Sequence, residues 1–416
     1  MNNSYYKYLC ENYPEKSKYI EWLKYELDNR IYYYGQNFRC PFEARSRRQE
    51  IFSKLAAFKR KIEGKSSSLS IGYDNCILSE AYFSVNEVLA NEFETKVLKF
   101  PWNQCSDVFA ESDIQTVLFQ LSNADFNELL SDSFCEGLDK LFETIKSFLV
   151  KNNIRLCVFP NDLVPINRIA IDACKKVNVP TSIYLHGLPA RYDIIDDNRA
   201  DYLCVWGEGI KVQYEKVGVK SNKILVTGHP VYSTIKYPKT KEISYDTPLV
   251  LSYSVCGSPS TSDEYRMADR GISVNFPWTV EKVLKQLGVK HAILRLHPSE
   301  NHKWYKKYID NDFYTIDTNT LDVSLKKASI VIGPTSTVSL DAASAGVAYF
   351  GFEPPMQFAY PLVPPFDNTE EDFPIAFTEE ELLYNLHNKR CMQPSVFGKY
   401  IASQFNMQLL INKAKQ

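Results

Sequence analysis

Short apolar runs of strand length alternate with single helical segments along this chain, and the alternation restricts the fold more than any other feature. The strand-length runs of the first series are IRLCVF (154–159), TSIYL (181–185), DYLCVW (201–206) and KILVT (223–227). Those of the second series include LVLSYS (249–254), HAILRL (291–296), DFYTI (312–316), SIVIG (329–333) and VAYFGF (347–352). Strands joined through one helix form right-handed crossovers and a parallel sheet. The pattern therefore predicts an α/β fold with two doubly wound, Rossmann-like sheets.

A proline-rich stretch of mixed charge separates the two series and predicts a two-domain chain, as expected for 416 residues. We expect a helical segment at 1–75, a first Rossmann-like domain at 76–235, a linker at 236–247 and a second Rossmann-like domain at 248–395. A terminal helix at 396–416 can then cross back to the first domain. The strands of the two domains would face a central cleft, with the helical segment as an addition at the N-terminal end.

Composition excludes several classes of partner. A formal charge of −2 and a pI near 6.4 give no general attraction to polyanions, so no nucleic acid is expected. No run of ~20 apolar residues is present, which predicts a cytoplasmic protein. The basic segment at 46–63 is either a solvated helix face or a peripheral contact with the inner face of the cytoplasmic membrane. Cys and His never cluster at ligand spacing, so no metal site is expected.

The first candidate site residue is His297, which directly follows the run HAILRL and precedes Pro298. We expect Pro298 to hold His297 extended and to start the next helix. An imidazole at the carboxyl edge of a sheet can bind a phosphate or protonate a leaving oxygen. A capping or purely structural histidine fits the same position. Arg295, two residues earlier, is a candidate contact for a diphosphate.

The second candidate is the segment GPTSTVSLDAASAG, where Thr335, Ser336 and Thr337 stand at an expected helix start. Their hydroxyls and the free backbone N–H groups of a helix N-terminus suit a phosphate, although an ordinary N-cap also explains them. Glu353 follows the next strand and can accept hydrogen bonds from ribose hydroxyls. Ser254 follows the first strand of the second series and is a further donor-binding candidate.

The first domain offers candidates for the acceptor and for a catalytic carboxylate. Asp162 follows IRLCVF and is either a base or nucleophile, or the N-cap of the next helix. Glu208 in VWGEG carries the same two interpretations. The acceptor-side candidates lie in LHGLPARYD, after TSIYL, and are His186, Gly187 and Arg191.

These motifs resemble those of bacterial glycosyltransferases of the two-Rossmann GT-B type. The stretch DYLCVWGEGIKVQYEKVGVKSNKILVTGHPVY looks like the end of the first GT-B half. The resemblance implies that residues 76–235 form the acceptor domain and residues 248–395 the nucleotide-sugar donor domain. A His-Pro pair followed by a Ser/Thr-rich helix start resembles the HP and S/T motifs of bacterial sialyltransferases and of capsule-type β-Kdo transferases. The resemblance implies a CMP-activated ulosonic acid, with His297 as phosphate contact or general acid and residues 335–337 holding the phosphate. Asp162 would match the acidic residue of the sialyltransferase D-D-G region, although this chain reads PNDLVP there.

The function expected from the resemblance is metal-independent transfer of Kdo or sialic acid. The donor would be a CMP-sugar, with no further cofactor, and the acceptor a bacterial surface glycan (capsule, O-antigen or lipooligosaccharide) or its lipid-linked primer. Two alternatives keep the fold. One is a transferase with a UDP-, GDP- or CDP-linked donor, such as a teichoic-acid-type polyol-phosphate transferase, and the other is an epimerase-like nucleotide-binding protein. The sequence indicates no oligomeric state.

Overall fold

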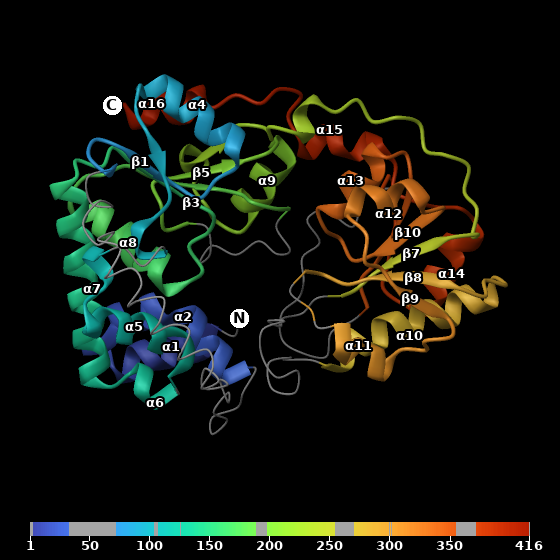
Figure 1. The fold of residues 1–416 in the computed structure, drawn as a ribbon, viewed down its shortest axis with the longest axis horizontal. Coiled ribbons are helices and arrows are strands. Elements are labelled where there is room, and N and C mark those ends of the chain that lie inside the picture. Colours follow the sequence, from blue (N-terminus) through green and yellow to red (C-terminus); the bar gives the residue numbers. More distant parts are fainter. Residues whose placement is uncertain are drawn as a thin grey trace, which may run out of the picture.

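The computed structural model describes residues 3–32, 72–103, 107–124, 126–188, 198–253, 270–298, 300, 302–354 and 372–415. They form two lobes, each built on a six-stranded sheet flanked by helices (Figure 1). The N-terminal lobe holds strands in the order β2-β1-β3-β4-β5-β6, and the C-terminal lobe holds β12-β11-β10-β7-β8-β9. Every strand pair is parallel. The predicted α/β fold with two doubly wound parallel sheets is confirmed.

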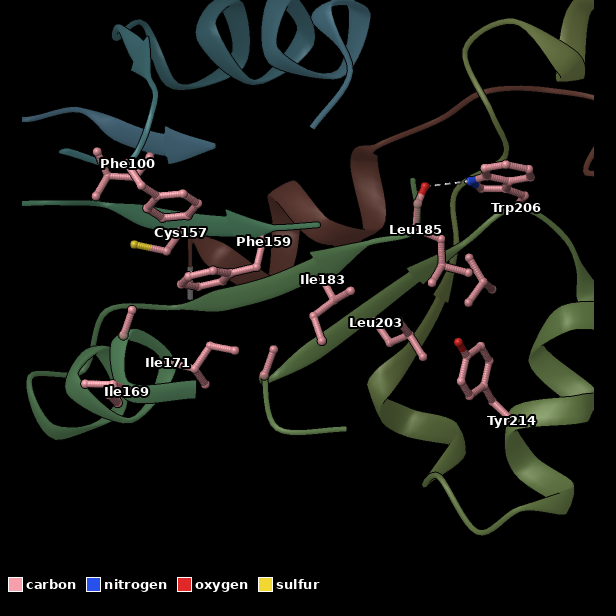
Figure 2. Close-up of a cluster of buried hydrophobic side chains, with 14 of the residues drawn as sticks. Phe100, Cys157, Phe159, Ile169, Ile171, Ile183, Leu185, Leu203, Trp206 and Tyr214 are labelled. Carbon is pink, nitrogen blue, oxygen red and sulfur yellow. Dashed lines mark hydrogen bonds between the residues drawn. The ribbon is translucent and has the colours of Figure 1, made fainter. Parts of the chain in front are cut away.

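The N-terminal sheet is buried on both faces. Its strands are β1 (Ile77–Ser79), β2 (Val97–Leu98), β3 (Leu156–Phe159), β4 (Thr181–Tyr184), β5 (Tyr202–Val205) and β6 (Ile224–Val226). The main helices around it are α4 (Phe83–Phe93), α7 (Asp132–Lys151), α8 (Pro165–Lys176) and α9 (Glu208–Lys216). Figure 2 shows Phe159, Ile183 and Leu203 on neighbouring strands beside apolar side chains of α8 and α9. The indole N–H of Trp206 donates to the Leu185 carbonyl at 3.1 Å and ties the ends of β4 and β5.

The N-terminal helices pack on this lobe. They are α1 (Asn3–Asn12) and α2 (Ser17–Tyr32), next to α5 (Ser112–Asn123) and α6 (Phe126–Leu129). Trp22 of α2 is buried, stacks on Phe142 of α7 and donates to Asp172 of α8 at 2.8 Å. Both α1 and α2 lie within the segment 1–75 that was expected to be helical. The basic segment at 46–63 lies outside the described residues.

The C-terminal sheet repeats the same construction. Its strands are β7 (Pro248–Leu251), β8 (Ala292–Arg295), β9 (Tyr314–Ile316), β10 (Ile330–Gly333), β11 (Ala348–Phe352) and β12 (Ile375–Ala376). The helices are α10 (Arg270–Gln286), α11 (His302–Tyr308), α12 (Leu321–Lys327), α13 (Val338–Ser344) and α14 (Glu379–His387). Pro277 lies inside α10, and the expected helix start at Thr335 is wrong because α13 begins at Val338.

The single terminal helix expected at 396–416 is also wrong. The chain instead forms α15 (Phe397–Tyr400) and α16 (Gln408–Ala414), joined by residues 401–407. The connecting backbone donates from Ala402 to the Trp206 carbonyl at 2.7 Å and from Asn406 to the Thr227 carbonyl at 2.8 Å. These bonds tie it to the ends of β5 and β6, which a continuous helix would not allow. The terminal segment thereby returns to the N-terminal lobe, where α16 lies beside α4 (Figure 1).

Both sheets have a position where the direction of winding reverses. In the N-terminal sheet the chain runs from β1 outward to β2 and then continues on the other side with β3. In the C-terminal sheet it runs from β7 through β8 to β9 and then continues on the other side with β10. Ligands of open α/β sheets bind outside the carboxyl ends of strands at such reversal points. The candidate positions are therefore the ends of β1 and β3 and the ends of β7 and β10.

Candidate active site

Polar residues gather at the carboxyl edge of the C-terminal sheet. Ser252 follows β7, His297 follows β8, Thr335 follows β10 and Glu353 follows β11. Three of these four strands are direct neighbours in the order β11-β10-β7, and β8 is next to β7. The structure therefore brings most of the sequence-predicted donor residues to one edge, at the reversal point between β7 and β10.

Glu353 is the buried carboxylate of this edge. Its Oε1 accepts hydrogen bonds from the backbone N–H of Thr335, at 2.6 Å, and from the Thr335 hydroxyl. Its other oxygen, Oε2, is buried and has no hydrogen-bond partner among the described residues. Burial raises the pKa of Glu353, and the donors Thr335 and Tyr253 oppose that rise. An unpartnered oxygen at this depth is suited to a ligand hydroxyl.

His297 presents an exposed imidazole on a tightly held loop. Its backbone N–H donates to the Ser252 hydroxyl at 2.9 Å and to Glu300 Oε2 at 3.2 Å. The expectation that Pro298 starts the next helix is wrong, because α11 begins at His302. Before α11, the backbone N–H of Glu300 donates to the His297 carbonyl at 2.9 Å and closes a turn.

Glu300 is a site residue that the sequence analysis missed. It is buried, and its carboxylate accepts from the hydroxyl of Ser252 and from that of Tyr305, the latter at 2.7 Å. Burial raises its pKa, although each of these donors opposes the rise. The carboxylate thus organises the turn that carries His297. Its only sequence signal is a position three residues after the histidine, which ordinary surface glutamates share.

Arg295 points to a different partner from the one expected. Its guanidinium donates to Asp317 Oδ2 at 2.6 Å and to the Asn319 carbonyl at 3.0 Å. The Asp317 side chain is only 1% exposed, and its charge is stabilised by Ser324 and Asn319 as well as by Arg295. The arginine therefore links β8 to the end of β9. Pro298 is exposed, and Ser254 and Arg191 lie outside the described residues.

The expected donor and acceptor segments meet between the lobes. The Thr337 hydroxyl accepts a hydrogen bond from the backbone N–H of Leu188 at 3.1 Å. A Cβ at Gly187 would lie 3.4 Å from the same hydroxyl oxygen. His186, the residue before, is exposed, and its Nδ1 lies 3.1 Å from the Pro160 carbonyl. A carbonyl only accepts, so Nδ1 carries the proton and Nε2 of the neutral ring is an acceptor.

The two carboxylates expected to be catalytic occupy different surroundings. Asp162 is completely buried, and its Oδ2 accepts from the backbone N–H of Arg199 at 2.7 Å. Its main-chain carbonyl accepts from the Arg168 guanidinium at 2.7 Å. Glu208 is the first residue of α9, and its side chain is 70% exposed, 3.8 Å from Lys211. The structure does not bring either carboxylate into contact with the edge that holds His297 and Glu353.

An aromatic cluster at the end of β6 lies where the lobes join. His229 is buried, and its Nδ1 accepts from the backbone N–H groups of Val231 and Tyr232, both at 3.1 Å. The rings of Tyr82, Trp206 and Tyr232 lie within 4.8 Å of its ring centre. Burial lowers the pKa of His229 to about 4. The imidazole is therefore neutral near pH 7.

A second hydrogen bond between the lobes leaves this cluster. The Tyr232 hydroxyl donates to Asp341 Oδ1 of α13 at 3.0 Å. Burial raises the pKa of Asp341, and the bond from Tyr232 opposes the rise. Thr337 directly precedes α13 and Asp341 lies within it. Both hydrogen bonds between the lobes therefore hold the start of α13, next to the segment 335–337.

The described residues contain no helix long and apolar enough to cross a membrane. In the same ranges, no group of three or more His, Cys, Asp or Glu side chains could hold a metal ion. Two parallel, doubly wound sheets in two contacting lobes form a GT-B-type architecture.

No protein-family model and no curated protein matches this sequence. Solved structures of similar architecture include a UDP-GlcNAc 2-epimerase from Methanocaldococcus jannaschii in complex with UDP-GlcNAc and UDP. It is 12% identical and has a TM-score of 0.48, over 82% of this chain and 99% of its own. The UDP-GlcNAc 2-epimerase from Neisseria meningitidis bound to UDP-GlcNAc is 9% identical, with a TM-score of 0.45 over 81% and 98% of the two chains. The glycosyltransferase of kitacinnamycin is 9% identical, with a TM-score of 0.40 over 80% and 89%. At these values a function must be argued from the site itself.

Proposed function

We propose that this protein is an enzyme that acts on a nucleotide-activated sugar, with the nucleotide bound at the carboxyl edge of the C-terminal sheet. The observation that carries the proposal is the Glu353 carboxyl. Thr335 holds one of its oxygens, and the other is buried and makes no hydrogen bond of full geometry with the described residues, although the Tyr253 hydroxyl interacts with the group. A ribose offers hydroxyl groups as donors to such an oxygen. The reversal point between β7 and β10 gives the same location independently.

The phosphate would lie among the hydroxyls of residues 335–337 and the imidazole of His297. The α13 helix has 7 residues, so we assign the phosphate to side-chain and loop donors rather than to a helix dipole. His297 is suited to this role because its ring is exposed while its backbone is fixed by Ser252 and Glu300. A positioned imidazole can hydrogen-bond a phosphate oxygen or deliver a proton to it.

The number of phosphates in the nucleotide distinguishes two more specific proposals, a CMP-linked sugar with one phosphate and a UDP-linked sugar with two. Arg295 is the cation that a diphosphate would be expected to recruit, and it is already paired with buried Asp317. That pairing favours a nucleotide with one phosphate and agrees with transfer of a CMP-linked ulosonic acid to a surface glycan or glycolipid. Transfer also needs a base for the acceptor hydroxyl, and the burial of Asp162 argues against that residue.

Because the burial of Asp162 argues against that residue as the base for transfer, a second candidate function is an epimerase-like enzyme that acts on a UDP-linked sugar. Such an enzyme uses the same nucleotide half-site and needs no second saccharide. It is also the activity named for the Methanocaldococcus jannaschii and Neisseria meningitidis proteins. The alternative of a transferase with a UDP-, GDP- or CDP-linked donor is examined by the same experiments.

Calorimetric titration of the full chain with CMP, UMP, UDP and GDP tests the shared proposal. We expect one nucleotide to bind, and Glu353→Gln to weaken it roughly tenfold, the effect of one hydrogen bond to a charged group. Glu380→Gln, an exposed substitution of the same kind on α14, should leave binding unchanged. Absence of binding by all four nucleotides, or equal affinities in wild type and Glu353→Gln, would overturn the proposal.

The reaction is then identified with intact sugars. Incubation with CMP-sialic acid, CMP-Kdo and UDP-GlcNAc, followed by NMR, separates nucleotide release from rearrangement of the sugar. Turnover of a CMP-sugar supports the ulosonic acid reading. Conversion of UDP-GlcNAc with CMP-sugars untouched rejects that reading in favour of the epimerase-like one.

A further inference from the structure

The reversal point of the N-terminal sheet carries a carboxylate that the sequence analysis did not single out. Glu80 is the residue after β1, and its backbone N–H donates to the Val158 carbonyl of β3 at 3.1 Å. That bond spans the gap between β1 and β3, where the winding reverses. Glu80 therefore occupies, in the N-terminal lobe, the position at which open α/β sheets bind their ligands.

The Glu80 side chain is held in place but remains accessible. Its Oε1 accepts from the side-chain amide of Asn103 at 2.6 Å, and the residue is half-buried. Within the described part of the chain, no other hydrogen bond to this carboxylate is formed. This arrangement differs from that of Asp162, whose carboxylate is completely buried at the end of β3. One oxygen of Glu80 is thus oriented, and the other can accept from a ligand.

His186 stands at the same edge, two strands away. Pro160, which holds its Nδ1, follows β3, and β3 lies between β1 and β4. The hydroxyl of Tyr82 donates to the His186 carbonyl at 2.5 Å, which connects the segment after β1 to the segment after β4. Adjacent strands are about 4.8 Å apart, so the segments that carry Glu80 and His186 are about 10 Å apart, on either side of the end of β3. This part of the edge therefore presents two acceptors, one carboxylate oxygen and one imidazole Nε2.

Both segments adjoin the C-terminal lobe at α13. The charge of Asp341 acts on Tyr82, two residues after Glu80. Gly187 and Leu188, directly after His186, contact the Thr337 hydroxyl. A sugar attached to a phosphate at residues 335–337 would therefore extend toward Glu80 and His186.

We propose that Glu80 and His186 form the subsite for the sugar ring of the nucleotide-activated sugar, each accepting a hydrogen bond from a sugar hydroxyl. This inference rests on the proposed function, because it takes the nucleotide to lie at the C-terminal edge. It also changes the role of His186, which the sequence assigned to the acceptor side.

The test compares the affinity for a nucleotide sugar with that for the free nucleotide, by calorimetry on the full chain. The probes are CMP with CMP-sialic acid, and UDP with UDP-GlcNAc. Glu80→Gln should weaken binding of the intact sugar roughly ten- to hundredfold and leave the free nucleotide unchanged within about twofold. His186→Ala should act in the same way, and His186→Gln should restore part of the loss because its carbonyl oxygen replaces Nε2.

Glu87→Gln is the matched control, because it removes the same charge from an exposed position on α4 of the same lobe. Equal losses for the nucleotide sugar and the free nucleotide, or no loss in Glu80→Gln, would overturn the subsite while leaving the nucleotide site intact. If the wild-type chain bound no nucleotide, the proposed function would fail and the subsite with it. Unchanged binding of free nucleotide by each variant shows that the variant is folded.

Discussion

The hydroxyl oxygen of Thr337 lies 3.1 Å from the backbone nitrogen of Leu188 and accepts its hydrogen bond. Thr337 belongs to the hydroxyl-rich turn before α13, and Leu188 belongs to the loop after β4, so the bond joins the two lobes. Tyr232 and Asp341 form a second link at 3.0 Å. Ligand binding between these segments must therefore be coupled to the contact between the lobes.

Thr337→Val should favour separation of the lobes. The substitution preserves shape but leaves the Leu188 N–H without its acceptor, at a cost of about 1 kcal/mol to the closed arrangement. We expect a larger radius of gyration in small-angle X-ray scattering. Thr337→Ser keeps the hydroxyl and should scatter like wild type. Identical scattering from the Val and Ser variants would show that the bond does not hold the lobes together.

Asp162 should contribute to the stability of the fold rather than to catalysis. Asp162→Ala leaves the Arg199 N–H unpaired in a completely buried position and should reduce the free energy of unfolding by about 2 kcal/mol. Asp162→Asn retains an oxygen acceptor, so we expect a smaller loss and unchanged nucleotide affinity. Denaturant unfolding and calorimetry measure the two effects. Loss of turnover in Asp162→Asn at full stability would restore the catalytic interpretation.

His229 should make the protein less stable in acid. Its pKa is lowered to about 4 in the folded state, whereas the unfolded chain binds a proton near pH 6.5. Lowering the pH from 6.5 to 4 therefore favours unfolding, by up to about 3 kcal/mol from this group. His229→Asn keeps an acceptor for the Val231 and Tyr232 N–H groups and cannot ionise.

The difference between the melting temperatures of wild type and His229→Asn isolates this contribution. Other buried groups, such as Asp341 and Glu353, have raised pKa values and act in both proteins alike. The difference should become less favourable to wild type as the pH falls from 6.5 to 4 and should be constant above about pH 7. A difference that does not change with pH would contradict the prediction.

Gly207→Ala should displace the terminal segment. A Cβ at this position would lie 2.3 Å from the backbone carbon and oxygen of Tyr400, which cannot move without breaking the contact between α15 and α9. We expect a loss of about 1–3 kcal/mol and faster proteolytic cleavage within residues 401–407. Gly398→Ala is the control, since nothing lies within 4 Å of its added Cβ. Equal cleavage rates in the two variants would argue against the packing explanation.

The strands were predictable because a strand that is buried on both faces has a continuous run of apolar residues in the sequence. The runs at 154–159, 181–185 and 329–333 became β3, β4 and β10. Helix ends were less predictable. Thr335 carries the hydroxyl and backbone N–H expected of an N-cap, but both donate to Glu353, 18 residues away, and the helix begins at Val338.

The same limit applies to the site. His297, Thr335, Thr337 and Glu353 were found because they follow strands, and strand ends share one edge of a parallel sheet. The partners of Arg295 and of Asp162 were not foreseeable, since Asp317 and Arg199 are 22 and 37 residues distant. Glu300 was missed because nothing local distinguishes it from a surface glutamate. Glu80 was missed because the strand before it, β1, has only 3 residues and gives a weak apolar signal.

The sequence by itself determined the two doubly wound sheets and the polar residues at the ends of their strands, because both depend on local apolar periodicity. Only the tertiary structure decided which carboxylates are accessible. Asp162 and Glu80 follow neighbouring strands of one sheet, yet one is completely buried beneath Arg199 and the other is half-buried beside Asn103. Accessibility depends on what the rest of the chain places over a side chain, and that information lies in contacts between distant residues.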